Sequence, residues 1–87
     1  MHAVVVNVTI NDPVAAERAL REQLVPRVSQ LPGFITGYWT LKNNTGLTML
    51  IFESEDTANA MSRQAEATVP PAMTFTDVEV REVAAHA

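Results

Sequence analysis

The chain has 87 residues, enough for one small domain, and its hydrophobic share of 47% excludes a disordered tail. Six Lys and Arg stand against ten Asp and Glu, which gives a formal net charge of −4. Nucleic-acid affinity depends on basic groups gathered on one surface. Because the basic residues here are few and scattered along the chain, we do not expect a nucleic-acid partner.

No cysteine is present, so disulfides and thiol chemistry are excluded. The first residues lack the basic segment of a secretion signal, and no apolar run approaches the roughly 18 residues that span a bilayer. We therefore expect a cytoplasmic protein without a membrane partner, folded as a single domain over residues 1–87.

The first predicted strand covers residues 3–10. Its even positions are all apolar, and its odd positions are mixed. The even set is Val4, Val6, Val8 and Ile10, and the odd set is Ala3, Val5, Asn7 and Thr9. Because side chains alternate between the two faces of a strand, we expect the even set to meet the helices.

The next segment is a predicted helix that starts with Asp12 as N-cap and Pro13 at the first helical position. Its apolar stripe consists of Ala16, Leu20, Leu24, Val28 and Leu31. Pro26 lacks the amide that would bond the Glu22 carbonyl, so it should kink or divide this helix. The simplest interpretation is a helix in two pieces that curves over the sheet, and the alternative is a bend that opens a cavity above it.

A β-hairpin is predicted at the centre of the chain. Residues 34–41 are rich in β-branched and aromatic residues, and residues 47–52 are almost continuously apolar. The four residues between Lys42 and Leu47 are rich in Asn and end in Gly46, which is typical of a hairpin loop.

A second helix is predicted from the N-cap Ser54 to about Ala65, followed by a loop over residues 66–72 and a strand over residues 73–83. The helix has a thin apolar stripe of Ala58, Met61 and Ala65, which lets it lie close to the sheet or leaves space beneath it. On the strand, one face is expected to hold Thr76, Val78 and Val80, and the other to hold Asp77, Glu79, Arg81 and Val83.

The element order is therefore β-α-β-β-α-β, an α+β, ferredoxin-like arrangement with an antiparallel four-stranded sheet and both helices on one face. The uncovered face carries Ala3 and Val5, and residues 47–52 are apolar on both faces. A solvent-facing sheet surface normally alternates to polar residues. We therefore predict a homodimer in which two such sheets pack face to face.

The chain resembles a known family in three places. These are Leu31-Pro32-Gly33-Phe34 before the second strand, the hairpin itself, and Phe52-Glu53-Ser54-Glu55 before the second helix. Over residues 2–83 it is similar to the dimeric α/β-barrel superfamily, in particular to its antibiotic-biosynthesis-monooxygenase-like branch. Relatives there include cofactor-independent oxygenases of polycyclic phenols, haem-degrading enzymes and isomerases. The shared motifs are a turn and a helix cap, so the resemblance specifies the fold better than the chemistry.

The features of the haem-degrading relatives are absent. Those relatives carry an Asn on the helix-facing side of the first strand, a Trp on the second helix and a His ligand shortly after it. Here Asn7 has the opposite parity, and neither the Trp nor the His is present at those places. The remaining histidines, His2 and His86, lie at opposite ends of the chain and form no metal site. We expect no cofactor.

Cofactor-free oxygenases of this family use a cluster of Asn, Trp, Tyr and Arg to orient a phenol and hold its anion. The resemblance makes Asn7, Tyr38, Trp39 and Arg81 the candidate catalytic residues here. Tyr38 and Trp39 are adjacent on a strand, so they point to opposite faces and cannot both line one pocket. Each candidate also has a structural interpretation. Trp39 and Tyr38 would serve packing. Asn7 would bond across the dimer interface to a residue such as Arg81 or Glu79, and Arg81 would pair with Glu79 or Asp77.

Three functions remain open. The first is a monooxygenase-like enzyme that acts on a small aromatic or quinone-like compound without metal or flavin. The second is a non-catalytic ligand-binding or sensing domain, and the third is a module whose role is dimerisation. No internal His and no Cys is present to serve as base or nucleophile of a triad.

Overall fold

The computed structural model describes residues 1–87 and has the element order that the sequence predicts. Its strands are β1 (His2–Ile10), β2 (Phe34–Lys42), β3 (Thr45–Phe52) and β4 (Met73–Glu82). Its helical segments are α1 (Pro13–Ala19), η1 (Leu20–Leu24), α2 (Val25–Ser29) and α3 (Glu55–Thr68). We call the continuous run of α1, η1 and α2 the first helical arm.

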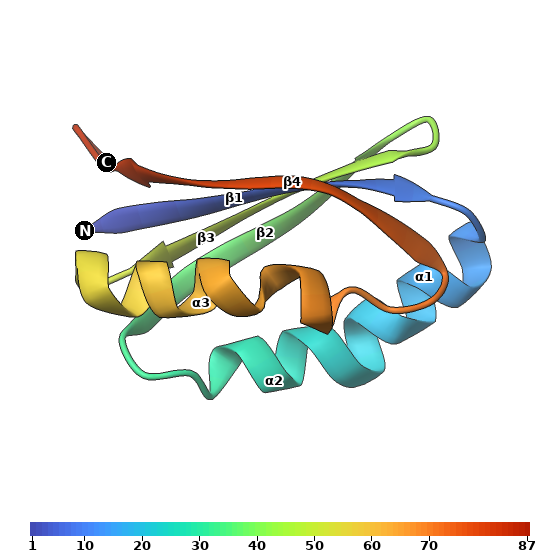
Figure 1. Ribbon diagram of the computed structural model, residues 1–87, viewed down its shortest axis with the longest axis horizontal. Helices are drawn as coiled ribbons and strands as arrows, with labels where there is room; N and C mark the ends of the chain where they lie inside the picture. Colours follow the sequence, from blue (N-terminus) through green and yellow to red (C-terminus); the bar gives the residue numbers. More distant parts are fainter.

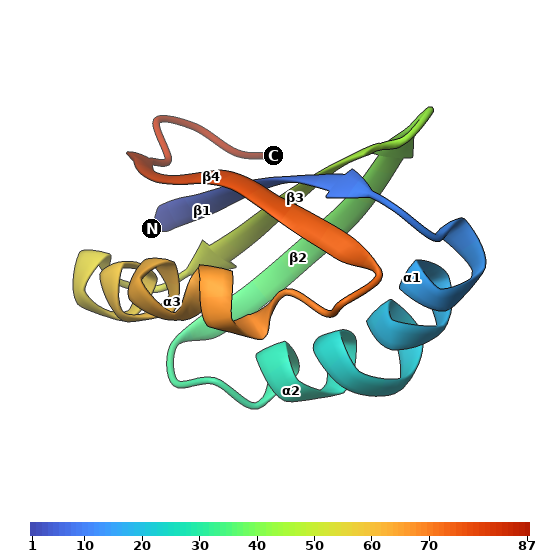
Figure 2. The same ribbon diagram turned by 45° about the vertical axis from the view of Figure 1, so that its right-hand side comes forward.

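The four strands form one sheet in the order β2-β3-β1-β4, and each neighbouring pair is antiparallel. Figure 1 shows the first helical arm and α3 on the same side of this sheet, and the turned view in Figure 2 agrees. The predicted α+β, ferredoxin-like β-α-β-β-α-β fold is confirmed. None of the helices is both long enough and apolar enough to cross a membrane.

The core lies between the sheet and the two helical layers. All four even positions of β1 are buried in it, as predicted, together with Leu50 and Phe52 of β3. The helices contribute Ala16, Val28, Ala58, Met61 and Ala65. The rings of Phe34 and Phe52 meet edge to face with centroids 5.8 Å apart, which fixes the start of β2 against the end of β3.

The first helical arm begins as expected and is interrupted by one π-helical segment. Asp12 Oδ1 accepts a hydrogen bond from the Ala15 amide at 3.1 Å, so Asp12 caps α1. Within η1 the helix widens, and the Val25 amide bonds back to the Leu20 carbonyl, five residues earlier. Pro26 follows directly and has no amide to offer. The predicted division of the helix at Pro26 is therefore present, in the form of a wide turn just before the proline.

The hairpin loop is shorter than predicted. Only Asn43 and Asn44 lie between β2 and β3, because Thr45 already pairs with Lys42. Asn43 provides the positive φ, at 57°, that a two-residue loop needs. Gly46 therefore lies inside β3, where a Cβ atom would stand only 2.9 Å from Val8 Cγ2. Its role is close packing rather than turn formation.

Helix α3 is longer than predicted. Ser54 caps it, since its Oγ accepts a hydrogen bond from the Thr57 amide at 3.2 Å. The helix then continues to Thr68, three residues past the predicted end at Ala65. The stiff segment at Pro70 and Pro71, and not the polar residues before it, ends the helix.

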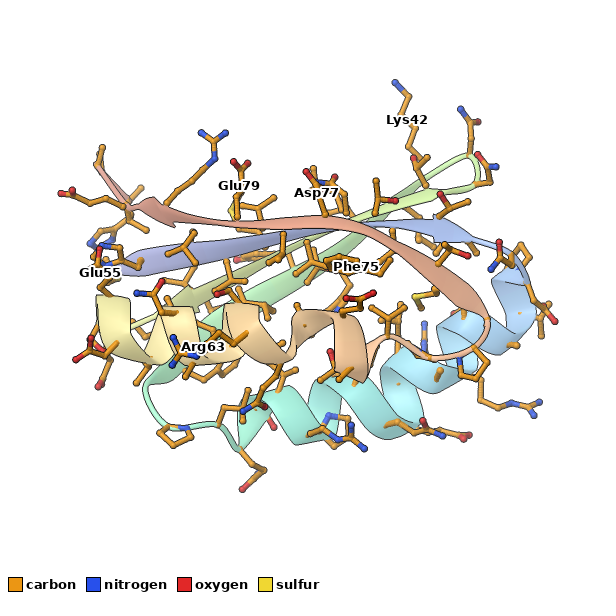
Figure 3. The ribbon with its side chains drawn as sticks, in the orientation of Figure 1. Lys42, Glu55, Arg63, Phe75, Asp77 and Glu79 are labelled. Carbon is orange, nitrogen blue, oxygen red and sulfur yellow. The ribbon has the colours of Figure 1, made fainter.

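Strand β4 contains a bulge that corrects the predicted faces. Asn7 pairs with Asp77 but Val8 pairs with Phe75, so Thr76 is an extra residue. Phe75, and not Thr76, therefore packs with Val78 against the core. Figure 3 shows Phe75 on the helix side of β4 and Asp77 and Glu79 on the opposite side. β4 ends at Glu82, one residue before the predicted end.

Candidate functional site

The candidate site is an apolar pocket between the sheet and the helices, which we call the helix–sheet pocket. Its free volume is about 40 Å³, room for no more than a few water molecules. Eleven of its fourteen lining residues are hydrophobic, and none is charged. The helical lining residues are Leu20, Leu24, Val28, Met61, Ala65 and Thr68; the others are Val6, Val8, Trp39, Thr48, Leu50, Val69, Pro70 and Met73.

Trp39 forms the β2 wall of the pocket because of strand register. Trp39 pairs with Thr48, which in turn pairs with Val6, and these three side chains share the helix-facing side of the sheet. The ring is partly buried against the core. The alternation of side chains along β2 therefore places Trp39, the largest side chain at the site, on the pocket side of the sheet.

The helices leave room for the pocket in two ways. Leu20 and Leu24 line it from η1, where the widened turn carries both side chains to the pocket side. Across from them, Ala65 is 1% exposed and fills little volume. The predicted bend and the thin stripe of α3 therefore coincide at a real, though small, cavity.

The chemistry that the pocket offers is apolar contact plus a few hydroxyl groups. Thr48 and Thr68 are the polar side chains among the lining residues. Thr68 Oγ1 donates a hydrogen bond to the Ala65 carbonyl at 2.8 Å, so it can accept one from a ligand. No carboxylate, imidazole, amine or phenol lines the cavity. The pocket is thus suited to bind and to exclude water, and it holds no general base of its own.

The structure separates the four candidate residues that the family resemblance implies. Trp39 lies at the helix–sheet pocket, whereas Asn7, Tyr38 and Arg81 lie on the uncovered face of the sheet. Tyr38 is 62% exposed there. The expectation that Tyr38 and Trp39 point to opposite faces agrees with this register.

Two of these residues already have polar partners. Asn7 Nδ2 donates to Asp77 Oδ1 at 2.8 Å, across the β1–β4 pair. Arg81 Nε lies 2.9 Å from Glu79 Oε1 on the same strand, and both side chains are largely exposed. Glu79 is a partner that the sequence predicts for Arg81. Asn7 instead bonds Asp77 of its own chain, and not the predicted Arg81 or Glu79, because Asp77 is its direct neighbour in the β1–β4 register.

Sequence reasoning missed both hydroxyl groups of the pocket. Thr48 interrupts an apolar strand on the same parity as Leu50, and that interruption is a usable signal. Thr68 carried no such signal, because it falls in the segment predicted as a loop.

No group of three metal-ligating side chains is present. The nearest approach to such a group is His2 Nε2 with Glu55 Oε2, 3.6 Å apart. Two ligands from a strand end and a helix start do not make a closed metal site.

No protein-family profile matches the sequence, and no curated protein does. Among solved structures, the chain is similar to a monooxygenase from the gene ActVA-Orf6 of Streptomyces coelicolor, solved in complex with nanaomycin D. The TM-score is 0.59 at 14% identity, and the match covers 99% of this chain and 90% of that chain. Likeness at this identity is evidence of fold and not of reaction. The comparison thereby confirms the fold that the resemblance implies, β-α-β-β-α-β with a four-stranded antiparallel sheet.

Proposed function

We propose that this protein binds a small, flat aromatic or quinone-like compound in the helix–sheet pocket, against the ring of Trp39. The observation that carries the proposal is an uncharged cavity, walled by a tryptophan, between sheet and helices. Once the lining side chains move apart to admit it, a flat ring system buries apolar surface there and can stack on or meet the edge of the indole. The complex of the structurally similar monooxygenase with nanaomycin D supports a small organic ligand for this fold.

The reaction that we propose for this site is cofactor-independent monooxygenation. In balanced form, a phenol and dioxygen give a quinone and water: one oxygen atom enters the ring and the other leaves as water. The apolar lining contributes binding and water exclusion. The resemblance implies Asn7, Tyr38 and Arg81 for proton transfer and anion binding, but they lie on the uncovered face and take no step at this pocket.

A non-catalytic ligand-binding role is the second candidate. It is favoured by the lack of any ionisable side chain in the pocket lining, because deprotonation of a phenol in the site needs a base within reach. Binding without turnover would make the chain a sensor or carrier of the same class of compound.

The first test is a titration of the intrinsic fluorescence of Trp39, the sole tryptophan, with 1-naphthol and with 1,4-naphthoquinone. We expect saturable quenching after correction for inner-filter absorption. Ala65→Val adds two methyl groups at a pocket wall that is 1% exposed and should weaken binding by about tenfold. Ala67→Val on the exposed side of the same helix is the matched control and should not change binding.

Oxygen consumption then separates the two candidates. An enzyme should consume oxygen with a phenol and release the corresponding quinone, and the Ala65→Val variant should lose this activity along with binding. Saturable quenching without oxygen uptake would support the sensor or carrier. No quenching by either compound would refute binding at Trp39 and leave dimerisation as the role of the chain.

A further inference from the structure

A second cavity lies beside the helix–sheet pocket, between α3 and the segment that links α2 to β2. We call it the outer cleft. It has a free volume of about 220 Å³ and is lined by Leu31, Pro32, Phe52, Thr57, Ala60, Met61 and Gln64. Pro32 and Gln64 are exposed and mark its mouth, whereas Phe52 is 1% exposed and forms its floor.

The two cavities lie in one line along the seam between sheet and helices. On β3 the lining moves from Leu50 in the helix–sheet pocket to Phe52 in the outer cleft. These residues are two apart on one face of a strand, which corresponds to about 6–7 Å. On the first helical arm and its end, the lining moves in the same way from Val28 to Leu31.

Helix α3 makes the same step in the opposite chain direction, from Ala65 in the helix–sheet pocket to Thr57 in the outer cleft. Three elements therefore agree that the cavities are neighbours. One residue lines both of them, and it is Met61. Met61 is 6% exposed and lies where the two cavities are nearest to each other.

A methionine is suited to be a movable partition. Its unbranched side chain has three rotatable bonds and adapts to the shape of what it contacts. Its neighbours one turn away on α3 are Ala58 and Ala65, and small side chains leave space for it to move. By itself the helix–sheet pocket is too small for a fused ring system, since ligand pockets usually enclose roughly 300 Å³ or more. With the partition displaced, the joined space comes close to that size.

We propose that Met61 divides a single ligand site into two, and that its displacement admits a compound of two or more fused rings that reaches from Trp39 to Phe52. The inference rests on the proposed function and adds to it the size class of the ligand. Single-ring compounds, by contrast, fit the outer cleft without moving Met61 and do not reach Trp39.

The test uses the intact protein with its methionine methyl groups labelled with carbon-13. The four methionines report on different places: Met61 on the partition, Met73 on the helix–sheet pocket, Met49 on the uncovered face and Met1 on the chain start. With 1-naphthol as probe, we expect the Met61 and Met73 signals to shift together with the quenching of Trp39, while Met49 and Met1 stay in place. With phenol, Met61 alone should shift.

A pair of variants adds a second readout. Met61→Ala removes the partition and should tighten 1-naphthol binding by about fivefold or more, relative to phenol. Met61→Leu keeps the volume and should leave the ratio of the two affinities within about twofold. Thermal unfolding of both variants is the control for folding. The methyl shifts of the native chain test the proposal even where a variant does not fold.

The outcomes distinguish this inference from the proposed function. Naphthol that quenches Trp39 and shifts Met73 while Met61 stays unchanged would refute the partition and keep the pocket. An unchanged affinity ratio in Met61→Ala would do the same. Naphthol that shifts Met61 without quenching Trp39 would place the ligand in the outer cleft alone, and no response at all would refute both proposals.

Discussion

At the scale of single residues, two positions decide the shape of the β2–β3 hairpin. Asn43 adopts a φ of 57°, which most residues with a Cβ atom avoid at a cost of roughly 1–2 kcal/mol. Asn is among the few side chains that tolerate this region. Gly46 is needed for another reason, because β1 passes so close that a Cβ would meet Val8. Asn43 therefore determines the loop conformation, and Gly46 allows the close pairing of β3 with β1.

Asn43→Val should therefore lower the free energy of unfolding by about 1–2 kcal/mol, because a β-branched residue strains the positive φ. Asn43→Gly should leave it unchanged or raise it by a few tenths of a kcal/mol. Urea unfolding followed by Trp39 fluorescence measures both changes.

The neighbouring Asn44 is the matched control for this prediction. It is equally exposed in the same loop but has no positive φ, so Asn44→Val should cost much less than Asn43→Val. Equal losses at the two positions would show that the loop geometry is not the cause.

At the scale of elements, α3 shows how a local signal sets a boundary. Ser54 Oγ accepts from the Thr57 amide, and Thr57 Oγ1 donates back to the Ser54 carbonyl at 3.1 Å. Glu55 and Asp56 follow in the first turn, where acidic groups complement the helix dipole. This start was predictable from sequence, because the capping residues act within one turn of each other.

Ser54→Ala should cost about 1 kcal/mol of stability, because the Thr57 amide loses its acceptor at the start of α3. Ser62→Ala on the same helix is the control. Ser62 Oγ only bonds the Asn59 carbonyl of its own helix, so its loss should change the unfolding free energy by less than about 0.5 kcal/mol. A loss at Ser62 equal to that at Ser54 would contradict the capping role.

Other element features depend on contacts that the sequence does not display. Strict alternation predicts Thr76 on the same face as Val78 and Val80, whereas the bulge opposite Asn7 and Val8 places Phe75 on that face instead. A second irregularity between Phe34 and Thr36 lets Phe34 meet Phe52. Both bulges arise from tertiary pairing, which local propensity cannot reveal.

The candidate site also combines features that the sequence predicts with features that depend on tertiary packing. Strand parity predicted that Trp39 and Tyr38 point to opposite faces. The thin stripe of α3 allowed two outcomes, a helix close to the sheet or space beneath the helix, and the structure has a small cavity there. The size of that space could not be predicted, because it depends on how Leu20, Leu24 and Met61 fill it. The sequence also could not predict that the two cavities lie side by side, because β3, α3 and the end of α2 bring them together only in the folded chain.

At the scale of the whole molecule, the uncovered face of the sheet is the feature that calls for a partner. Met49 pairs with Val5 on one side and with Tyr38 on the other. Leu47 lies two residues before Met49 on β3 and therefore shares its face. In the single chain Tyr38 is 62% exposed, Leu47 41% and Met49 40%. A contiguous apolar surface of this kind is typical of an interface. Figure 1 shows no helix on this side.

We predict a homodimer through this face, as the sequence indicates. A stable interface of ordinary size buries about 800 Å² on each partner, and the face of all four strands is open to such a partner. In the dimer the pairs Asn7–Asp77 and Arg81–Glu79 would lie at the interface. Their polar groups already bond each other within each chain, so burial against the partner would leave no polar group unpaired.

Met49→Lys tests this prediction, since it places a charge at the centre of the face. An unpaired charge in a dry interface should weaken association by about a hundredfold or more, whereas the same charge in water costs a monomer little. Val14→Lys is the control, because Val14 is 74% exposed on α1, away from the sheet. We expect the native chain and Val14→Lys to sediment as dimers at micromolar concentration and Met49→Lys as a monomer. A native chain that sediments as a monomer there would refute the dimer, and the apolar face would then need a different partner.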